Sequence, residues 1–386
     1  MQQLPKNLEN KLIKRSKENS LRNLGRTSGL IDFSSNDYLG FAHNETIFSK
    51  TFQLLLTENI AQNGATGSRL LTGNHKLYDT LEAKLAHFHE AESALVFNSG
   101  YDANVGFFGS VPQRGDVVFY DEFIHASIRE GIGTSLAKNY KFRHNQLDDL
   151  KAKIDLSAQA QSTTQETNIY IVTESVFSMD GDTPDLKALA QFCKSNGYRL
   201  IIDEAHATGV LGKNGTGLVQ ELGLQKDVFA RLVTFGKGIG AHGAAVLGSE
   251  QLKSYLVNYA RSLIYSTGLS PHSIATAITA YEYLRHEGAS ALNLLKENIG
   301  LFREKIDTLG LRQKFINSES AIQSCIIPGN KKVKDVSQKL MEKGFDVKAI
   351  LSPTVPEGEE RLRFCLHSDN SKAEIGLVLE LLAKYI

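Results

Sequence analysis

Cysteine, net charge and long apolar runs are all scarce in this sequence. Only three cysteines occur in 386 residues, and they lie too far apart for a metal knuckle or a disulfide framework. We therefore expect reduced cysteines and a cytoplasmic protein. The 43 Lys and Arg residues balance the 43 Asp and Glu residues. The chain as a whole thus has no net field to hold nucleic acid or an anionic membrane, and neither is expected as a partner.

Export and membrane insertion also lack a signal. The N-terminal segment has no apolar run behind its charges and carries Glu9 and Glu18, so it does not resemble a secretory signal or a transit peptide. The longest stretch without a charged residue, 262–281, contains seven Ser or Thr residues, which a bilayer core would penalise. We expect no membrane-spanning segment.

What is present is the composition of a globular chain, with 41% hydrophobic and 22% charged residues. From about residue 46 to 250, short apolar runs alternate with longer helical patterns. Because buried strands that alternate with helices form parallel sheets, we expect an α/β fold whose large domain holds a mostly parallel, seven-stranded sheet. The last part of the chain predicts a smaller α+β domain.

This pattern divides the chain into three predicted segments. Residues 1–45 form an N-terminal arm and turn, residues 46–270 form the large domain, and residues 271–386 form a linking helix and the small C-terminal domain.

A lysine in a glycine-rich loop is the first candidate for chemistry. Lys237 follows the apolar run R-L-V-T-F and lies between Gly236 and Gly238, so the backbone can turn tightly and a ligand can approach the amine. The loop also contains G-x-G-x-x-G at Gly238, Gly240 and Gly243. A dinucleotide site would need an acidic residue about twenty positions on and an opening βαβ unit, and both are missing. An ordinary surface lysine is the plain alternative.

Four other strand ends carry polar groups. Taken singly, each has an ordinary structural explanation: an ion pair, a buried histidine or a helix N-cap. The candidates are Asp203 and His206, Glu174 and Ser178, His125, and the turn Ser99–Gly100–Tyr101, whose free N–H groups at a helix start would suit a phosphate. No metal is expected, because Asp203 and His206 lack further ligands at short spacing.

Together these groups match the needs of pyridoxal 5'-phosphate. A lysine attaches the cofactor, an aspartate keeps the pyridine nitrogen protonated so that the ring accepts electrons, and a flat side chain stacks on the ring. The sequence therefore predicts a pyridoxal phosphate enzyme.

The motifs also resemble those of one family. T-F-G-K-G-I-G-A-H-G at 234–243 matches a pyridoxal phosphate attachment motif, and N-S-G-Y, H-A-S, T-E-S-V-F-S-M-D-G-D and D-E-A-H-A-T-G precede it in the order found in the α-oxoamine synthases. The resemblance runs from S-S-N-D-Y-L-G at 34–40 to R-L-R-F at 361–364. It implies a fold-type I transferase that acts as a homodimer with shared active sites.

The resemblance implies roles for matching residues. Lys237 would attach the cofactor and act as the base, Asp203 would hold the pyridine nitrogen, and His125 would stack on the ring and assist proton movement. Further cofactor contacts implied are His206, Ser178, Glu174, Gly100, Tyr101, Thr234 and, from the partner subunit, Thr267. The substrate contacts implied are Arg363 and Asn36 for an amino-acid carboxylate, Arg22 and Thr354 for an acyl thioester, and His125.

The implied reaction is a decarboxylative condensation of an amino acid with an acyl thioester. S-A-I-Q at 320–323 and P-T-V-P-E-G-E-E-R-L-R at 353–363 favour L-alanine and a pimeloyl thioester of coenzyme A or acyl carrier protein. Glycine with an acetyl donor and serine with a palmitoyl donor are alternatives within the family. Alternatives from other classes are a silent partner subunit, against which the intact Lys237 argues, and a nicotinamide-dependent dehydrogenase.

The family usually has small residues after R-L-R, where F-C-L-H-S-D-N stands here.

Overall fold

The computed structural model describes residues 3–22, 24, 29–159 and 167–386. Two compact units emerge, and each is described by itself. The larger comprises residues 37–178 and 183–293, and the smaller comprises residues 1–36, 179–182 and 294–386, as far as these are described. Among the described residues, no helix has the length and apolar character needed to cross a bilayer.

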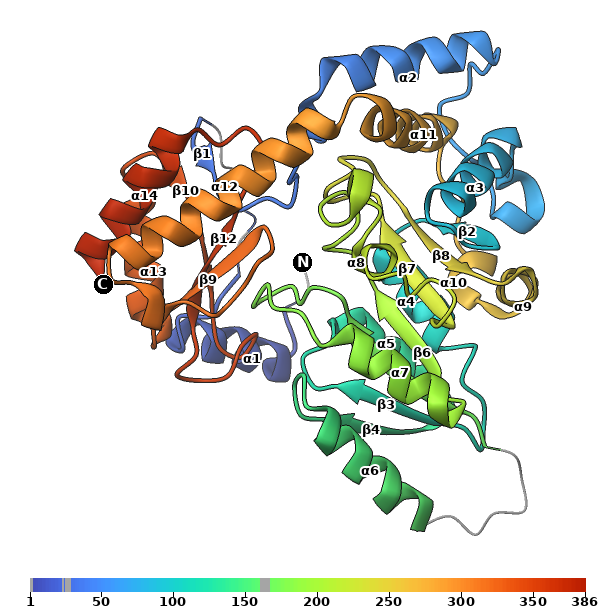
Figure 1. Ribbon diagram of the computed structural model, residues 1–386, viewed down its shortest axis with the longest axis horizontal. Helices are drawn as coiled ribbons and strands as arrows, with labels where there is room; N and C mark the ends of the chain where they lie inside the picture. The colour runs from blue at the N-terminus through green and yellow to red at the C-terminus, as the bar shows by residue number, and fades with distance from the viewer. Residues whose placement is uncertain (1–2, 23, 25–28, 160–166) are drawn as a thin grey trace. The chain divides into compact units, whose positions relative to one another are not determined.

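The larger unit contains one seven-stranded sheet, which confirms the predicted α/β fold class (Figure 1). The strand order is β2-β8-β7-β6-β5-β3-β4, and β8 alone runs antiparallel to its neighbours. The strands are β2 (Ser93–Phe97), β3 (Val117–Asp121), β4 (Lys138–Phe142), β5 (Ile169–Glu174), β6 (Arg199–Asp203), β7 (Ala230–Thr234) and β8 (Ala244–Gly248).

Helices cover both faces of this sheet. Side chains alternate between the faces along each strand, and apolar side chains on both faces pack against helices. Ile201 and Val172 point to one hydrophobic layer, while Leu200 and Ile171 point to the other. The helices of the larger unit are α2 (Glu45–Thr57), α3 (Lys76–Phe88), α4 (Gly100–Phe108), α5 (Ala126–Thr134), α6 (Leu147–Gln159), α7 (Leu186–Asn196), α8 (Leu218–Glu221), α9 (Glu250–Tyr259), α10 (Arg261–Ile264) and α11 (Pro271–His286).

A buried ion pair binds the outward backbone groups of Val96 on the edge strand β2. Arg69 Nη1 lies 2.6 Å from Glu82 Oε1. Glu82 Oε1 accepts the N–H of Val96 at 2.9 Å, and Arg69 donates to the Val96 carbonyl at 3.0 Å. The pair therefore satisfies the backbone N–H and carbonyl of Val96, as a neighbouring strand would.

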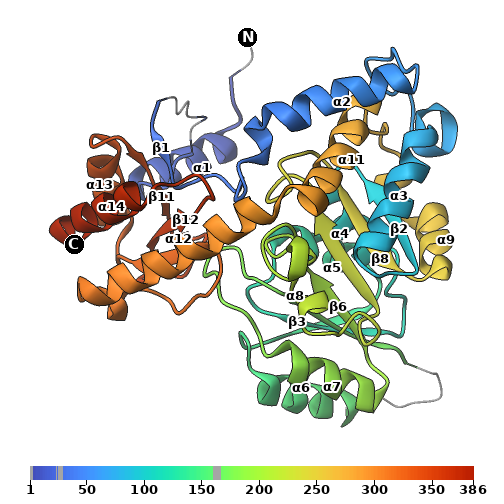
Figure 2. The same cartoon turned by 45° about the horizontal axis from the view of Figure 1, so that its top comes forward.

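The smaller unit contains the C-terminal sheet (Figure 2). β11 (Lys348–Ile350), β12 (Arg361–Cys365) and β9 (Ile322–Ile326) pair antiparallel, and β1 (Ile31–Asp32) pairs parallel with β10 (Phe345–Asp346). The helices are α1 (Lys6–Lys17), α12 (Ala289–Thr308), α13 (Asn330–Met341) and α14 (Lys372–Tyr385), and α12 begins within the larger unit. A capping box between Ser371 and Glu374 starts α14.

The observed units place the segment around residue 271 differently from the predicted segments. α11 packs on α2 and α3 within the larger unit. The chain passes to the smaller unit only inside α12, between Asn293 and Leu294. The apolar face of α11, with Ile274, Ile278 and Tyr281 buried, explains why this helix belongs to the larger core.

Candidate active site

The predicted site residues of the larger unit gather at one edge of its sheet. β2, β3, β5, β6 and β7 run in the same direction, so their carboxyl ends meet there. This is the edge at which open α/β sheets bind ligands.

Lys237 contacts His206 at this edge. The Lys237 Nζ lies 2.9 Å from His206 Nε2, and His206 Nδ1 lies 2.7 Å from the Tyr38 hydroxyl. A lysine ammonium can only donate, so with Lys237 protonated Nε2 accepts and the ring proton on Nδ1 is donated to the tyrosine oxygen. Both His206 and Tyr38 are buried. The two side chains therefore orient the amine before any ligand binds.

Asp203 ends β6 with both carboxylate oxygens engaged. Asn104 Nδ2 donates to Oδ2 at 2.9 Å, and the N–H of Ala205 donates to Oδ1 at 2.9 Å. Asn104 Nδ2 also reaches Ser127 Oγ at 3.1 Å, and Ser127 Oγ lies 2.7 Å from His125 Nδ1. A continuous polar network thus joins Asp203 to His125.

Burial and neighbouring charges alter the titration of two groups here. Burial raises the pKa of Glu174 well above its usual value, and the charge of Asp203 raises it further, against Lys237 and the His125 N–H. That N–H donates to Glu174 Oε1 at 2.5 Å. Desolvation lowers the pKa of His125, and Lys237 and Arg129 lower it too, while Asp203 opposes them. His125 therefore favours a neutral ring, which can stack on a ligand.

The turn between β2 and α4 is formed by a helix cap and a closely packed glycine. Ser99 caps α4 by accepting the N–H of Asp102 at 3.0 Å. A Cβ on Gly100 would lie 2.7 Å from Thr234 Cγ2, so only glycine lets α4 start this close to the end of β7. Tyr101 is exposed and its hydroxyl donates to Glu130, which raises the tyrosine pKa. Gly100 and Thr234 thus lie together, as the resemblance implies.

Two further predicted contacts lie close to this edge in sequence or space. Ser178 lies in the turn after β5. The Thr267 carbonyl accepts from Asn98 Nδ2 at 2.7 Å, which places Thr267 beside the β2–α4 turn of its own chain. Its role across a subunit boundary stays a prediction.

Other protein atoms occupy the space beside the glycines around Lys237, so these glycines do not make room for a nucleotide. A Cβ on Gly238 would lie 2.8 Å from the Thr208 carbonyl, and one on Gly240 would lie 2.4 Å from the backbone nitrogen of Ala42. The segment leads into β8, whereas a dinucleotide fingerprint opens a helix. This local geometry disfavours the dehydrogenase alternative.

The smaller unit holds four of the five residues expected to bind substrate, and the fifth, His125, lies in the larger unit. Arg363 Nη2 donates to Asn36 Oδ1 at 2.9 Å, and Arg363 is largely buried. Arg22 Nη2 reaches Thr354 Oγ1 at 3.4 Å. Each predicted pair is therefore brought together within this unit.

The unusual segment after R-L-R is well packed. The ring of His367 is buried, with Nε2 3.0 Å from Ser35 Oγ and Nδ1 3.1 Å from the Asp32 carbonyl. Asn298 Nδ2 donates to the carbonyls of His367 and Asn370. His367 therefore fixes the segment that leads into Asn36.

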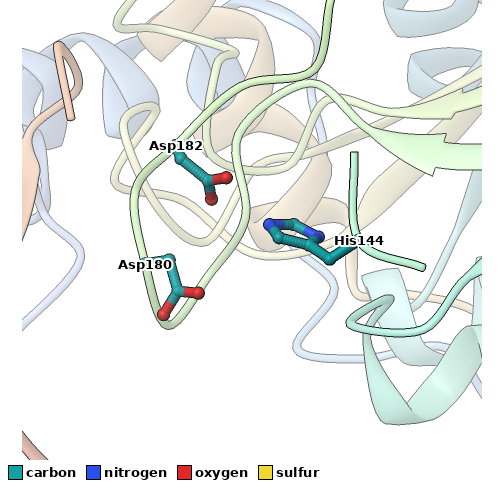
Figure 3. A group of neighbouring side chains, drawn as sticks. All are labelled: His144, Asp180 and Asp182. Atoms are coloured by element: carbon teal, nitrogen blue, oxygen red, sulfur yellow. The ribbon is translucent and has the colours of Figure 1, made fainter. Parts of the chain in front are cut away.

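Two acidic residues lie on the loop that follows β5. Figure 3 shows Asp180 and Asp182 on this loop, and Asp180 forms an ion pair with the buried Arg361 within the smaller unit. His144, also drawn there, follows β4 in the larger unit, where its Nδ1 lies 2.8 Å from Asp121 Oδ1. The expectation of no metal stays a prediction.

Tyr38 and Asn104 are site residues that the sequence reasoning missed. Tyr38 lies inside the S-S-N-D-Y-L-G motif, and its complete burial is visible only in the structure. Asn104 offered a signal, because it is a polar residue between Ala103 and Phe107 on the buried face of α4. A buried amide needs a partner, and here that partner is Asp203.

Comparison with known proteins identifies the family. The family model described as "Aminotransferase class I and II" matches residues 28–380. The chain belongs to this family.

Its relatives narrow the class further. The chain is 40% identical over 376 residues to the 8-amino-7-oxononanoate synthase of Emericella nidulans, covering 93% of this chain and 90% of the relative. It is 38% identical to the enzyme of that name from Lysinibacillus sphaericus, covering 91% and 87%. A solved 8-amino-7-oxononanoate synthase from Francisella tularensis has a TM-score of 0.76 at 29% identity, covering 92% of this chain and 97% of that one. These findings confirm the resemblance drawn from the motifs.

Proposed function

We propose that this protein joins L-alanine to a pimeloyl thioester and releases 8-amino-7-oxononanoate, carbon dioxide and a free thiol, a step of biotin synthesis, using pyridoxal phosphate. The observation that carries the proposal is the Lys237–His206–Tyr38 contact beside Asp203, in a chain 40% identical to a synthase of that name. Two features of the larger unit support the cofactor. The turn at Gly100 has no room for a side chain beside Thr234, and the Lys237 amine is held in place by His206.

Each residue at the sheet edge has a proposed task toward the cofactor. Asp203, held by Asn104, would keep the pyridine nitrogen protonated, and His125 would stack on the ring. His206 and Ser178 would hydrogen-bond the phenolic oxygen, and Glu174, which pairs with Asp203 in the sheet, would be a further cofactor contact. Gly100, Tyr101 and Thr234 would hold the phosphate. When bound, pyridoxal phosphate supplies an electron sink for the bonds broken at the α-carbon.

Lys237 would also move the proton. Lys237 would hold the cofactor through its amine, and the same amine, when free, would remove the α-proton of alanine. The α-carbon would then form a bond with the carbonyl carbon of the thioester, the thiolate would leave, the carboxylate would depart as carbon dioxide, and a proton would return to the α-carbon. Arg363 and Asn36 would bind the alanine carboxylate, and Arg22 and Thr354 would line the acyl-thioester side.

We further propose a homodimer that shares its active sites. Helix α2 supports it: Phe48, Phe52 and Leu56, spaced by four residues, are 70%, 59% and 54% exposed, while Ile47 and Thr51 face the core. An exposed apolar stripe of this kind indicates an interface. Thr267 would join the partner's phosphate site. A cytoplasmic location agrees with three free, buried cysteines.

Serine palmitoyl transfer is the second candidate, because a serine palmitoyltransferase from Sphingomonas wittichii has a TM-score of 0.84 at 27% identity, covering 92% of this chain and 87% of that one. The higher identity to 8-amino-7-oxononanoate synthases favours alanine and a pimeloyl donor.

Reductive labelling tests the cofactor assignment. Borohydride treatment of the protein with pyridoxal phosphate should place a pyridoxyl group on Lys237, as read by peptide mass mapping. Lys237→Ala should carry no label, and Lys187→Ala on the exposed face of α7 should be labelled as the wild type. A label on another lysine would overturn the assignment.

A further inference from the structure

The polar network between Asp203 and His125 has two buried middle links. These are Asn104 on α4 and Ser127 on α5, which are 2% and 0% exposed. The two helices approach closely because of Gly131, where a Cβ would lie 2.8 Å from the Asn104 carbonyl. Neither link can therefore replace a lost partner with solvent.

Asp203 sets the orientation of the Asn104 amide. An ionised carboxylate only accepts hydrogen bonds, so the atom 2.9 Å from Asp203 Oδ2 has to be the amide nitrogen, Nδ2. The same nitrogen donates its second proton to Ser127 Oγ at 3.1 Å. Asn104 Oδ1 is buried and has no hydrogen-bond partner among the described residues. A flipped amide would place this oxygen against the carboxylate, so the observed orientation keeps both hydrogen bonds and leaves one oxygen unpaired.

Ser127 passes the direction of hydrogen bonding on to His125. The backbone N–H of Ser127 donates to His125 Nδ1 at 3.3 Å, which makes His125 the N-cap of α5. Nδ1 therefore carries a lone pair. Ser127 Oγ lies 2.7 Å from the same nitrogen and already accepts from Asn104, so the hydroxyl proton is also donated to Nδ1. Two donors thus point at Nδ1.

We propose that Asn104 and Ser127 are positioning residues that hold His125 as a neutral ring with its proton on Nε2. A proton on Nδ1 would meet the Ser127 N–H. It would also turn the Ser127 hydroxyl away from its acceptor in a buried site, where an unmade hydrogen bond is costly.

The charged groups around the ring act in both directions. Lys237 on the loop after β7 and Arg129 on α5 lower the pKa of His125, as burial does, whereas Asp203 at the end of β6 raises it. Glu174 at the end of β5 accepts the backbone N–H of His125. Asp203 alone would thus favour a protonated ring, and the direction of the hydrogen bonds opposes it.

A neutral ring suits the task proposed for His125, and in this respect the inference rests on the proposed function. The cofactor would lie beside His125 with its pyridine nitrogen protonated by virtue of Asp203. An imidazolium stacked on that cationic ring would be repelled, whereas a neutral imidazole would not. The network would therefore let one carboxylate serve the cofactor without charging the histidine.

Nitrogen-15 NMR of the full chain with labelled histidine reads the tautomer directly, because protonated and unprotonated ring nitrogens resonate far apart. His125→Gln identifies the His125 signals among those of the 11 histidines. At neutral pH, both without and with pyridoxal phosphate, we expect a protonated Nε2 and an unprotonated Nδ1. A protonated Nδ1 in the wild type would overturn the proposal, whether or not any variant folds.

Ser127→Ala and Asn104→Leu test the two links. At a fixed pH, the ratio of protonated to neutral His125 should rise about fivefold in each, the effect of one ordinary hydrogen bond. Ser127→Thr keeps the hydroxyl and should restore the wild-type ratio. Ser135→Ala is the matched control, because it removes a hydroxyl that binds the Ile132 carbonyl at the other end of α5.

The ratio separates this inference from the proposed function, because it is measured without alanine or thioester. A fivefold rise in the two test variants would stand even if no condensation product formed. An unchanged ratio in both test variants, or an equal rise in Ser135→Ala, would show that the network does not set the state of His125.

Discussion

Asp203 and Glu204 are adjacent residues at the end of β6, and their side chains point to opposite sides of the sheet. Asp203 meets Asn104 on the site side. Glu204 accepts the N–H of Val219 at 3.0 Å, and its Oε2 lies 3.7 Å from Arg231 Nη1. The carboxylate of Glu204 therefore holds the loop that carries His206, while that of Asp203 belongs to the polar network of the site.

Arg363 provides a prediction at this scale. A guanidinium binds a carboxylate through two parallel hydrogen bonds, and an ammonium cannot. Arg363→Lys keeps the charge, so the KM for alanine should rise roughly tenfold or more, with little change in the KM for the thioester. Steady-state kinetics measure both constants. A larger effect on the thioester would show that Arg363 does not bind the carboxylate.

His89 gives a prediction about pH and stability. It is fully buried between the Thr216 carbonyl and the Tyr281 hydroxyl. Burial, aided by Arg231, lowers its pKa from about 6.5 to about 3. A depressed histidine pKa contributes stability above pH 6.5 that is lost as the pH falls, because only the unfolded chain takes up the proton.

The wild type should therefore lose about 1.4 kcal/mol more unfolding free energy per pH unit between pH 6 and pH 4 than His89→Gln does. Urea titrations at several pH values measure this difference. Parallel pH dependences in the two proteins would contradict the assignment of a neutral, buried His89.

At the scale of secondary-structure elements, the loop between two strands sets the position of Lys237. The loop between β7 and β8 holds Lys237, and its shape depends on Gly240, which has φ +63° and packs on the backbone of residues 41 and 42. Gly236 has ordinary backbone angles, and its nearest contact for a Cβ is 3.6 Å. The two glycines therefore form a matched pair.

Gly240→Ala should destabilise the protein by about 1–3 kcal/mol and lower the fraction of Lys237 labelled on borohydride reduction. Gly236→Ala should leave both quantities close to those of the wild type. Thermal unfolding and peptide mapping give the two readings. Equal behaviour of the variants would mean that the left-handed turn does not set the position of the lysine.

The elements also show what the sequence could and could not predict. Apolar runs of strand length, such as R-L-V-T-F, mark six of the seven strands of the large sheet. The seventh, β4, was missed as a segment because K-N-Y-K-F is polar and, as an edge strand, mostly exposed. The motifs predicted Lys237, Asp203 and His206, but Tyr38 reaches the site from 168 positions away from His206. No local pattern reports such a contact.

At the scale of the whole molecule, the proposed homodimer gives a prediction. Phe52→Glu on α2 should give a protein of half the mass in light scattering, with activity strongly reduced, because a charge would be buried in the proposed dimer interface. Leu156→Glu is the control, since Leu156 is also exposed, at 62%, but lies on α6 away from the α2 stripe. A dimer that survives in Phe52→Glu would place the interface elsewhere.

Substrate choice tests the central claim most directly. The measurement is kcat/KM for the nine combinations of alanine, glycine or serine with pimeloyl, acetyl or palmitoyl thioester, with the product identified by mass. The account predicts that alanine with the pimeloyl donor gives the highest value, that the product is 8-amino-7-oxononanoate, and that Lys237→Ala abolishes it. A clear preference for glycine with the acetyl donor, or for serine with the palmitoyl donor, would contradict the proposed function.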